Sequence, residues 1–193
     1  MEPNLHDQHI AFFREIRISV LIRPVAFGAA CQGNFYIANM KIVPYNSKYR
    51  KDFVEMNLAW ISSMFKVEPE DERELSNVET AVAAGAEIFF AVDDSDNVMA
   101  CCMIAPRDSG EWEIMKFAAK GMYTGTGAGG ACLKACIEYA RVKQAKSIVL
   151  VSNRRCTHAI HLYEKFGFVE IPVDKEKFPY DRGDISFEMK LFD

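Results

Sequence analysis

The fold of this chain is decided by a strand, a glycine-rich loop and a helix, which together read EWEIMKFAAKGMYTGTGAGGACLKACIEYARV over residues 111–142. Trp112–Ala119 has the apolar character of a buried strand. The loop supplies glycines at positions 125, 127, 129 and 130, and such a backbone can curl so that its N–H groups face inward at a helix N-terminus. Unpaired N–H groups and the positive end of the helix dipole favour an anion there. The sequence therefore predicts a phosphate site in this loop.

Three known kinds of glycine loop compete for this anion site. A nucleoside-triphosphate loop requires Gly-Lys-Ser/Thr after its turn, whereas Gly129-Gly130 is followed here by Ala131-Cys132. A dinucleotide loop lies in the first strand–helix–strand unit and has an acidic residue about 20 residues later. Here the loop follows three or four predicted strands, and the next strand ends in Ser152-Asn153-Arg154. Both of these kinds are therefore disfavoured, and a third, a pyrophosphate loop for coenzyme A, is left open by the pattern.

Strands and helices alternate on both sides of this stretch. Upstream, a strand is expected at 41–45, a helix with one buried face after Ser47, and a second helix from Pro69 to Gly85. The apolar runs 86–92 and 98–104 are separated by polar turn residues and predict a hairpin. Downstream, we expect a strand at 147–152, a helix at 157–166 and a last strand at 185–191. One α/β domain over residues 40–193 is predicted, without repeats or linkers.

Residues 1–39 do not follow this pattern and are interpreted as an N-terminal extension. The apolar residues 18–30 are suggestive of a signal sequence, but Arg23-Pro24 interrupts them and acidic residues precede them. We expect either an extension upstream of a natural start at Met40, or an added helix or strand without a role in the chemistry.

Composition excludes several classes of function. The chain has 23 Lys and Arg against 27 Asp and Glu, a net charge of −4, so nucleic acid is not an expected partner. No uncharged apolar run reaches the roughly 18 residues of a membrane-spanning helix, so no membrane partner is expected either. The six cysteines form no CxxC pair and no zinc-type spacing, which indicates buried free thiols in a reduced, cytoplasmic protein.

Two motifs resemble those of the GNAT superfamily of N-acetyltransferases, and the resemblance covers about residues 40–193. The strand segment EIMKFA at 113–118 and the loop TGTGAG at 124–129 are similar to the central motif, whose loop reads Gln/Arg-x-x-Gly-x-Gly/Ala. Further along, AIHLYEKFGF at 159–168 is similar to the closing helix-to-strand motif, A-x-x-L-Y-x-K-x-G-F. Both motifs occur in order with one strand between them. The resemblance implies a single α/β domain, with a mixed central sheet flanked by helices and a splay between the central strands.

The resemblance also implies the ligands. Acetyl-CoA is the expected co-substrate, no metal is expected, and the expected acceptor is a primary amine of a small molecule or peptide that attacks the thioester directly. The residues expected to bind the cofactor are Phe117, Ala118, Ala119, Thr124, Gly125, Thr126, Gly127, Ala128, Gly129, Gly130 and Asn153.

Two loop positions depart from the superfamily pattern. Thr124 stands where Gln or Arg is usual, and Thr126 stands where a basic residue is common. Backbone N–H groups can still hold a pyrophosphate. The missing positive charge is expected to come from Lys120, Arg154 or Arg155.

The expected catalytic residues are Tyr163 and Glu113. By resemblance, Tyr163 lies near the sulfur and donates a proton to the departing thiolate, although its helical spacing also fits a core residue. Glu113 matches a glutamate that some members use as general base, directly or through water. A surface carboxylate, with water as the base, is the alternative interpretation.

The acceptor region is the least defined by sequence. An acidic cluster, Glu68, Glu70, Asp71, Glu72 and Glu74, would attract a cationic amine or merely stabilise a helix N-terminus. By resemblance, the segment Tyr180–Asp184 is expected to line the acceptor pocket, whereas His158 and His161 are expected to be exposed and not to bind metal. The sequence leaves open whether the protein forms a homodimer. The alternative function is a non-enzymatic acyl-CoA-binding or regulatory module on the same fold, and a phosphate-binding protein unrelated to coenzyme A is a third.

Overall fold

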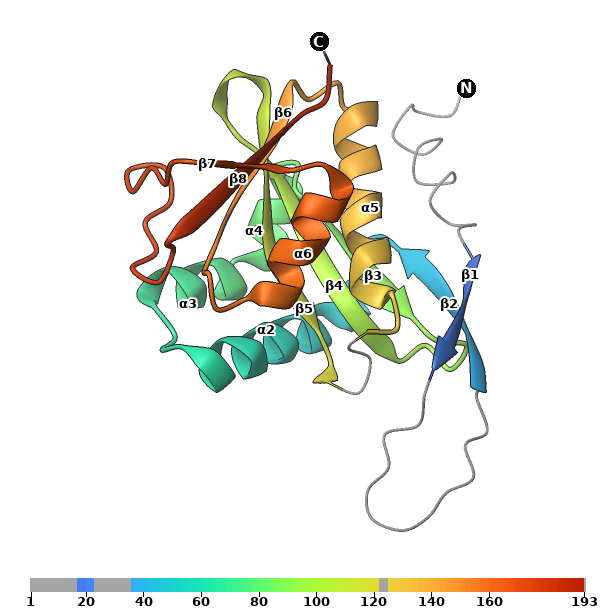
Figure 1. The fold of residues 1–193 in the computed structure, drawn as a ribbon. Coiled ribbons are helices and arrows are strands. Elements are labelled where there is room, and N and C mark those ends of the chain that lie inside the picture. Colours follow the sequence, from blue (N-terminus) through green and yellow to red (C-terminus); the bar gives the residue numbers. More distant parts are fainter. Residues whose placement is uncertain (1–16, 23–35, 122–124, 193) are drawn as a thin grey trace.

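The computed structural model describes residues 17–22, 36–121 and 125–192, drawn in colour in Figure 1. Along the chain the elements are β1 (Arg17–Ile22), β2 (Tyr36–Val43), the 3-10 turn η1 (Ser47–Tyr49), α2 (Arg50–Met64), α3 (Pro69–Ser76), α4 (Val78–Ala83), β3 (Glu87–Val92), β4 (Val98–Pro106), the 3-10 turn η2 (Asp108–Gly110), β5 (Glu111–Ala119), α5 (Ala128–Val142), β6 (Ser147–Ser152), α6 (Thr157–Phe166), β7 (Val169–Ile171) and β8 (Ile185–Lys190).

One eight-stranded sheet with the strand order β1-β2-β3-β4-β5-β6-β8-β7 forms the centre of the molecule. All neighbouring strands are antiparallel except β5 and β6, which are parallel. These two pair only where residues 111–113 face residues 147–149, and beyond that point they diverge. The mixed sheet, its flanking helices and the splay between its central strands confirm the expected fold class.

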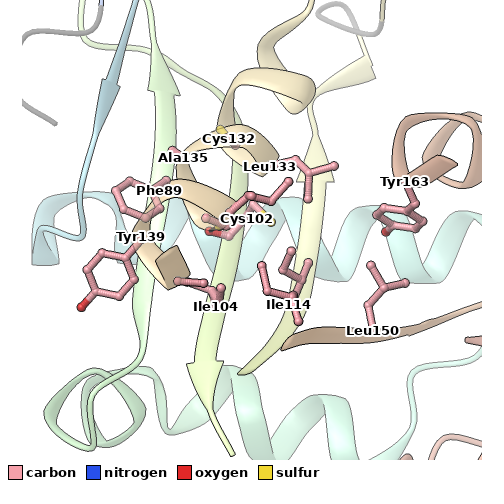
Figure 2. Packing of buried hydrophobic residues seen from close by; sticks show 14 of the residues in the cluster. Phe89, Cys102, Ile104, Ile114, Cys132, Leu133, Ala135, Tyr139, Leu150 and Tyr163 are labelled. Carbon is pink, nitrogen blue, oxygen red and sulfur yellow. Dashed lines mark hydrogen bonds between the residues drawn. The ribbon is translucent and has the colours of Figure 1, made fainter. Parts of the chain in front are cut away.

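The sheet separates two hydrophobic cores, because successive side chains of a strand point to opposite faces. On β3, Phe89 and Ala91 pack under α5 and α6, whereas Ile88 and Phe90 pack under α2, α3 and α4. Figure 2 shows the first core, in which α5 lies across β3, β4 and β5. The cysteines among the described residues are all buried and free of disulfides, as expected, and Cys31 lies outside those residues.

The structure corrects the expected helix from Pro69 to Gly85. Two helices occupy this stretch, α3 and α4, and they are separated at Asn77, whose backbone is not helical (φ −107°, ψ 30°). The Asn77 side-chain amide donates to the carbonyl of Arg73 at 2.7 Å, and the Ser76 hydroxyl donates to the carbonyl of Glu72 at 2.7 Å. Short polar side chains of this kind compete with the main chain for carbonyl acceptors and favour a helix break.

The start of the sheet also differs from expectation. β2 begins at Tyr36, ahead of the predicted start of the domain at Met40, and β1 pairs with it at the sheet edge. The short strand β7 was not predicted. The expectation that residues 1–39 have no role in the chemistry stays a prediction. In the part of the chain that the structure describes, no helix has the length and apolar character needed to cross a membrane.

Candidate active site

A cavity of about 840 Å³ lies where β5 and β6 diverge. Its walls are α2, β5, the first turn of α5, the end of β6, α6 and residues 180–183. The sequence-predicted site residues that line it are Glu113, Phe117, Ala118, Ala119, Gly125, Gly127, Gly129, Gly130, Asn153 and Tyr163. Residues that are 50 positions apart in the sequence therefore meet at one cavity.

The glycine loop closes one end of this cavity. Gly125 and Gly127 have left-handed backbones (φ +80° and +88°), a conformation that glycine adopts without steric cost. α5 begins directly after Gly127, so the N–H groups of its first turn have no intrahelical acceptor. Thr126 and Ala128 are buried and do not line the cavity, whereas Thr124 lies outside the described residues.

Gly129 lets the backbone of α5 approach β5 closely. A Cβ atom built there would lie 3.1 Å from the Phe117 ring, which is tighter than ordinary van der Waals contact. The Phe117 ring in turn lies 6.1 Å from that of Tyr163, centroid to centroid. The loop, the centre of β5 and α6 are thus packed side by side along the cavity.

A β-bulge shapes β5 within the cavity. Cys101 of β4 pairs with Ala118 and Met103 pairs with Met115, so Lys116 and Phe117 together face a single residue of β4. Lys116 has a positive φ of 48°, which is uncommon for a residue other than glycine. Past residue 113, the edge of β5 that faces away from β4 has no pairing with β6. Backbone groups on that edge are available to a ligand.

Tyr163 reaches the cavity from α6 and is otherwise surrounded by aromatic rings. Its ring lies 6.0 Å from Phe168 and 5.7 Å from Phe187, in addition to its contact with Phe117. Burial raises the pKa of the Tyr163 phenol well above its ordinary value of 10, since the charged form would be desolvated. The hydroxyl is therefore protonated at neutral pH.

Glu113 is buried on β5, at the last position where β5 pairs with β6. Desolvation raises the pKa of its carboxyl to about 7, although Arg107, whose Nε lies 3.1 Å from Oε2, opposes that effect. The negative charge of Glu74 raises this pKa further. The alternative of a surface carboxylate is wrong, because Glu113 is buried and its carboxyl has a pKa near neutrality.

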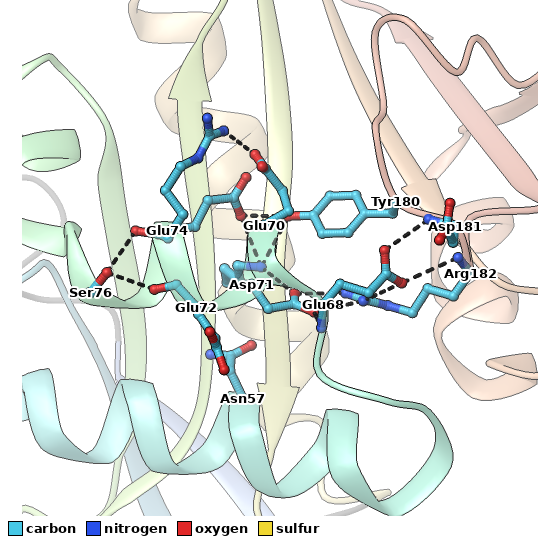
Figure 3. A network of polar contacts seen from close by, with 12 residues as sticks. Asn57, Glu68, Glu70, Asp71, Glu72, Glu74, Ser76, Tyr180, Asp181 and Arg182 are labelled. Carbon is cyan, nitrogen blue, oxygen red and sulfur yellow. Dashed lines mark hydrogen bonds and ion pairs between the residues drawn. The ribbon is translucent and has the colours of Figure 1, made fainter.

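Three residues of the acidic cluster turn inward and form a buried polar network with Lys116, Tyr180 and Arg182 (Figure 3). Arg182 donates to both carboxylate oxygens of Asp71, each at 2.7 Å. Lys116 Nζ lies 2.8 Å from Asp71 Oδ1 and 2.9 Å from Glu74 Oε2. Tyr180 donates to Glu74 at 2.6 Å.

Most of the negative charge of the cluster is thereby balanced inside the protein. Burial alone would raise the pKa of Asp71, but hydrogen bonds from Arg182 and Lys116 outweigh it and lower that pKa. Glu68 pairs with Arg182 at 2.9 Å, and Glu70 pairs with Arg73. The cluster is therefore largely a structural network, and its field on an acceptor is weaker than five acidic residues imply.

The network also brings in residues that sequence reasoning missed. Tyr180, Arg182 and Gly183 line the cavity, as expected for this segment, but their link to α3 was not predicted. Lys116 was not singled out either. A lysine in the middle of an apolar strand is the one signal that could have identified it, because such a charge requires a buried partner.

The candidate cations for the loop have different environments. Lys120 pairs with Asp52 at 2.8 Å, and Arg154 pairs with Glu170 at 2.5 Å outside the cavity. Arg155 does line the cavity. Its NH1 donates to the carbonyl of Met64 at 3.0 Å, and its guanidinium lies 5.0 Å from the centre of the Phe65 ring.

Asn153 also lines the cavity, but its side chain already has partners. Its Nδ2 donates to the carbonyl of Arg182 at 2.7 Å, and its Oδ1 accepts from the N–H of Arg155 at 2.9 Å. Asn153 thus ties the end of β6 to the segment that carries Arg182. His158 and His161 are exposed on α6, and no group of three or more potential metal ligands occurs among the described residues.

Comparison with known proteins agrees with this fold. The model of the acetyltransferase (GNAT) family matches residues 53–168. A GNAT-family acetyltransferase from Staphylococcus aureus Mu50 superposes with a TM-score of 0.72 at 20% identity, over 79% of this chain and 99% of that one. YncA from Salmonella typhimurium, solved with its cofactor acetyl-CoA, gives 0.62 at 18% identity over 80% and 95%.

A third similar structure is the PaiA N-acetyltransferase from Thermoplasma acidophilum in complex with coenzyme A. It superposes with a TM-score of 0.63 at 14% identity, over 78% of this chain and 98% of that one. No curated protein sequence matches the chain.

Proposed function

The chain belongs to the GNAT acetyltransferase family, and we propose that it is an N-acetyltransferase that moves the acetyl group of acetyl-CoA to a primary amine of a small molecule or peptide. The amine attacks directly, with both substrates bound at once. One observation carries the proposal: a single cavity brings together the glycine loop, the unpaired edge of β5, Tyr163 and Glu113.

The cavity fits a long cofactor with phosphates at one end. A side chain at Gly129 would crowd Phe117, and as glycine this position leaves bare backbone in the first turn of α5, which can bind a pyrophosphate. The edge of β5 at residues 117–119 offers backbone groups to an extended, amide-containing arm. When bound, acetyl-CoA supplies the thioester that the amine attacks and the thiolate that leaves.

Glu113 is the proposed general base. Attack by an amine forms a C–N bond and breaks the C–S bond, and the amine must lose one proton in the process. A carboxyl with a pKa of about 7 is ionised in part at neutral pH and is a stronger base than an ordinary glutamate. Glu113 takes that proton directly or through a water molecule.

Tyr163 is the proposed general acid. Its phenol stays protonated because burial raises its pKa, so it carries a proton to give to the sulfur. The same apolar surroundings, made by Phe117, Phe168 and Phe187, also raise the pKa of a thiol held beside them. A thiolate formed there is a correspondingly better proton acceptor.

The acceptor end of the cavity is assigned to the side lined by α2 and residues 180–183. Trp60, Met64 and Phe65 supply an apolar wall, and Glu113 and Tyr180 supply polar groups. Since Asp71, Glu68 and Glu74 are paired internally, we expect amines with apolar substituents to be accepted as well as polyamines.

A panel of amines with acetyl-CoA, followed by release of free thiol, tests the function. Turnover with any primary amine, lost in Glu113→Gln and kept in Glu111→Gln, supports the proposal. Glu111 is a fitting control because it lies on the same strand but pairs with Lys177 outside the cavity. Tight binding of coenzyme A in calorimetry, with no turnover across the panel, would instead support a non-enzymatic acyl-CoA-binding module.

A further inference from the structure

Among the described residues, Arg107 is the cation that forms an ion pair with the proposed base. It follows directly after β4, and its Nε lies 3.1 Å from Oε2 of Glu113. The Arg107 side chain is 28% exposed and that of Glu113 is 5% exposed, so the pair lies largely inside the protein. Salt and solvent therefore screen it much less than a pair on the surface.

The position of the Arg107 guanidinium is fixed by contacts on two further sides. Its NH2 donates to the carbonyl of Lys177 at 2.9 Å, and its carbon lies 5.2 Å from the centre of the buried Phe178 ring. The backbone N–H of Arg107 also donates to the carbonyl of Glu111 at 2.7 Å. Because the N–H groups of a guanidinium form a rigid planar fork, fixing one of them fixes the direction of the others. These contacts therefore aim the guanidinium at Glu113.

Arg107 acts on the cavity only through the carboxylate that it holds. Glu113 lines the cavity, whereas Arg107 does not. Its guanidinium therefore lies behind the carboxylate as seen from the cavity, where it does not reach an acceptor or a thioester. Any effect of Arg107 on the chemistry is an effect on the charge and the position of the Glu113 carboxylate.

The groups that influence the charge of Glu113, or feel it, come from several elements: Arg107, Lys116, Glu74, Glu111 and Tyr180. Burial raises the pKa of Tyr180 above its ordinary 10, so this phenol is neutral. Lys116 already pairs with two other carboxylates. Arg107 has the largest effect of any charge on the pKa of Glu113, and in the described part of the chain it pairs with no other carboxylate.

Loss of this cation would remove the base from the reaction at neutral pH. An opposite charge at such a distance typically lowers the pKa of a carboxyl by about 1–3. The pKa of Glu113 is about 7 with Arg107 in place, so without Arg107 the carboxyl would remain mostly protonated at pH 7. A glutamate side chain also has several rotatable bonds, and a base must lie within hydrogen-bond reach of the amine.

We propose that Arg107 is a positioning residue for the reaction, which holds the Glu113 carboxylate ionised and directed at the cavity. The proposal rests on the function proposed above and adds the residue on which the base depends. The proton of the amine moves to the carboxylate, which becomes neutral. Arg107 keeps its own protons throughout, because a guanidinium does not lose one in proteins.

A titration of Glu113 tests the charge without measuring activity. The carboxyl carbon is followed by ¹³C NMR and identified by its absence in Glu113→Gln. The midpoint should lie at about 7 in the wild type and rise by about 1–3 pH units in Arg107→Gln. Lys177→Gln is the matched control, because it removes the neighbouring ion pair with Glu111 and retains the backbone carbonyl that Arg107 contacts. Its midpoint should stay close to that of the wild type.

Turnover tests the position of the carboxylate. With an arylamine acceptor, which stays neutral over this range, the rise of rate with pH should move upward in Arg107→Gln by as much as the titration midpoint. Above both midpoints a deficit of about 10- to 100-fold in kcat should remain, since the carboxylate is ionised but no longer held. The KM for acetyl-CoA should not change. In the Glu113→Gln background, adding Arg107→Gln should change the rate less than about twofold.

The other outcomes contradict the proposal in distinguishable ways. An unchanged Glu113 titration in Arg107→Gln overturns it and leaves the acetyltransferase assignment intact. Full recovery of kcat at high pH, or a further loss in the Glu113→Gln background, contradicts positioning through the base. If Arg107→Gln does not fold, Arg107→Lys replaces it: the midpoint should stay near 7 while kcat falls about tenfold at high pH, and a wild-type kcat refutes the proposal. No turnover of the wild type with any amine overturns the proposed function together with this inference.

Discussion

Replacing Glu113 with Gln should make the protein more stable above neutral pH while removing its proposed base. The pKa of Glu113 rises from the ordinary 4.5 to about 7 on folding, a difference of about 2.5. At about 1.4 kcal/mol for each pKa unit, keeping the ionised carboxylate buried costs about 3 kcal/mol of folding free energy. Glutamine has nearly the same shape and cannot ionise, so the variant avoids that cost.

The sign follows from proton binding in the two states. Between pH 4.5 and pH 7 the folded chain retains a proton on Glu113 that the unfolded chain has released, so the free energy of unfolding decreases as pH rises. The stabilising contribution of the neutral carboxyl is complete below pH 4.5 and is lost as pH passes through 7. Glu113→Gln should match the wild type near pH 4.5 and exceed it increasingly, by up to about 3 kcal/mol at pH 8.

Urea denaturation of both proteins at half-unit steps from pH 4.5 to 8.5 measures this difference. Glu111→Gln retains Glu113 and should keep a similar pH dependence, shifted slightly to lower pH because the negative charge of Glu111 contributes a little to the raised pKa of Glu113. In the activity assay, an arylamine acceptor stays neutral over this range, so the wild-type rate should rise about tenfold between pH 6 and pH 8. Parallel stability curves for the wild type and Glu113→Gln would refute a raised pKa, and a pH-independent wild-type rate would remove Glu113 from catalysis.

Three further substitutions test the rest of the site. Tyr163→Phe should lower turnover by about 10- to 1000-fold with little change in cofactor affinity, whereas Tyr139→Phe, a tyrosine outside this cavity, should not. Gly129→Ala crowds the aromatic ring across the loop and should weaken binding of coenzyme A about tenfold, and Gly121→Ala, which has open space around it, should leave binding unchanged. Asp71→Asn removes the carboxylate that Lys116 and Arg182 share and leaves them only Glu74 and Glu68, so it should lower the free energy of unfolding by about 2–3 kcal/mol in urea titrations; an effect below about 1 kcal/mol would show that the network is not structural.

The elements that could be predicted from sequence are those with local signals. The helix at 157–166 has an apolar face and ends before Gly167, and the strand at 147–152 matches the structure residue for residue. The position of the loop followed from its glycines. The break at Asn77 was missed because an apolar spacing continues across it, and the polar side chains that cause the break are common in helices as well.

The buried network could not be predicted, because its pairs are distant in sequence. Lys116 and Asp71 are 45 positions apart, and Arg182 and Asp71 are 111 positions apart. The sequence shows that five of the seven residues at positions 68–74 are acidic. It does not indicate which cation pairs with which of them. The raised pKa of Glu113 has the same origin, since it depends on burial by elements that sequence patterns do not place around it.

The bulge in β5 explains how one strand serves both halves of the proposed reaction. Before it, Ile114 faces the core under α5 and Met115 faces the other core, as strict alternation requires. Alternation alone would then turn Lys116 toward α5 and Phe117 toward α2. The extra residue reverses this parity, as a one-residue slip in register does, so that Phe117 packs on the α5 side and Ala118 on the opposite one.

The consequence is a division of the cavity between two neighbouring side chains. Phe117 reaches the glycine loop and the ring of Tyr163, the proposed cofactor side. Lys116 reaches Asp71 and the hydroxyl of Tyr180, the proposed acceptor side. A strand without the bulge would place the lysine in the apolar core and the aromatic ring in the polar network, where neither has a partner of its own kind. The left-handed backbone at Lys116 is thus the local strain that allows both groups to converge on one site.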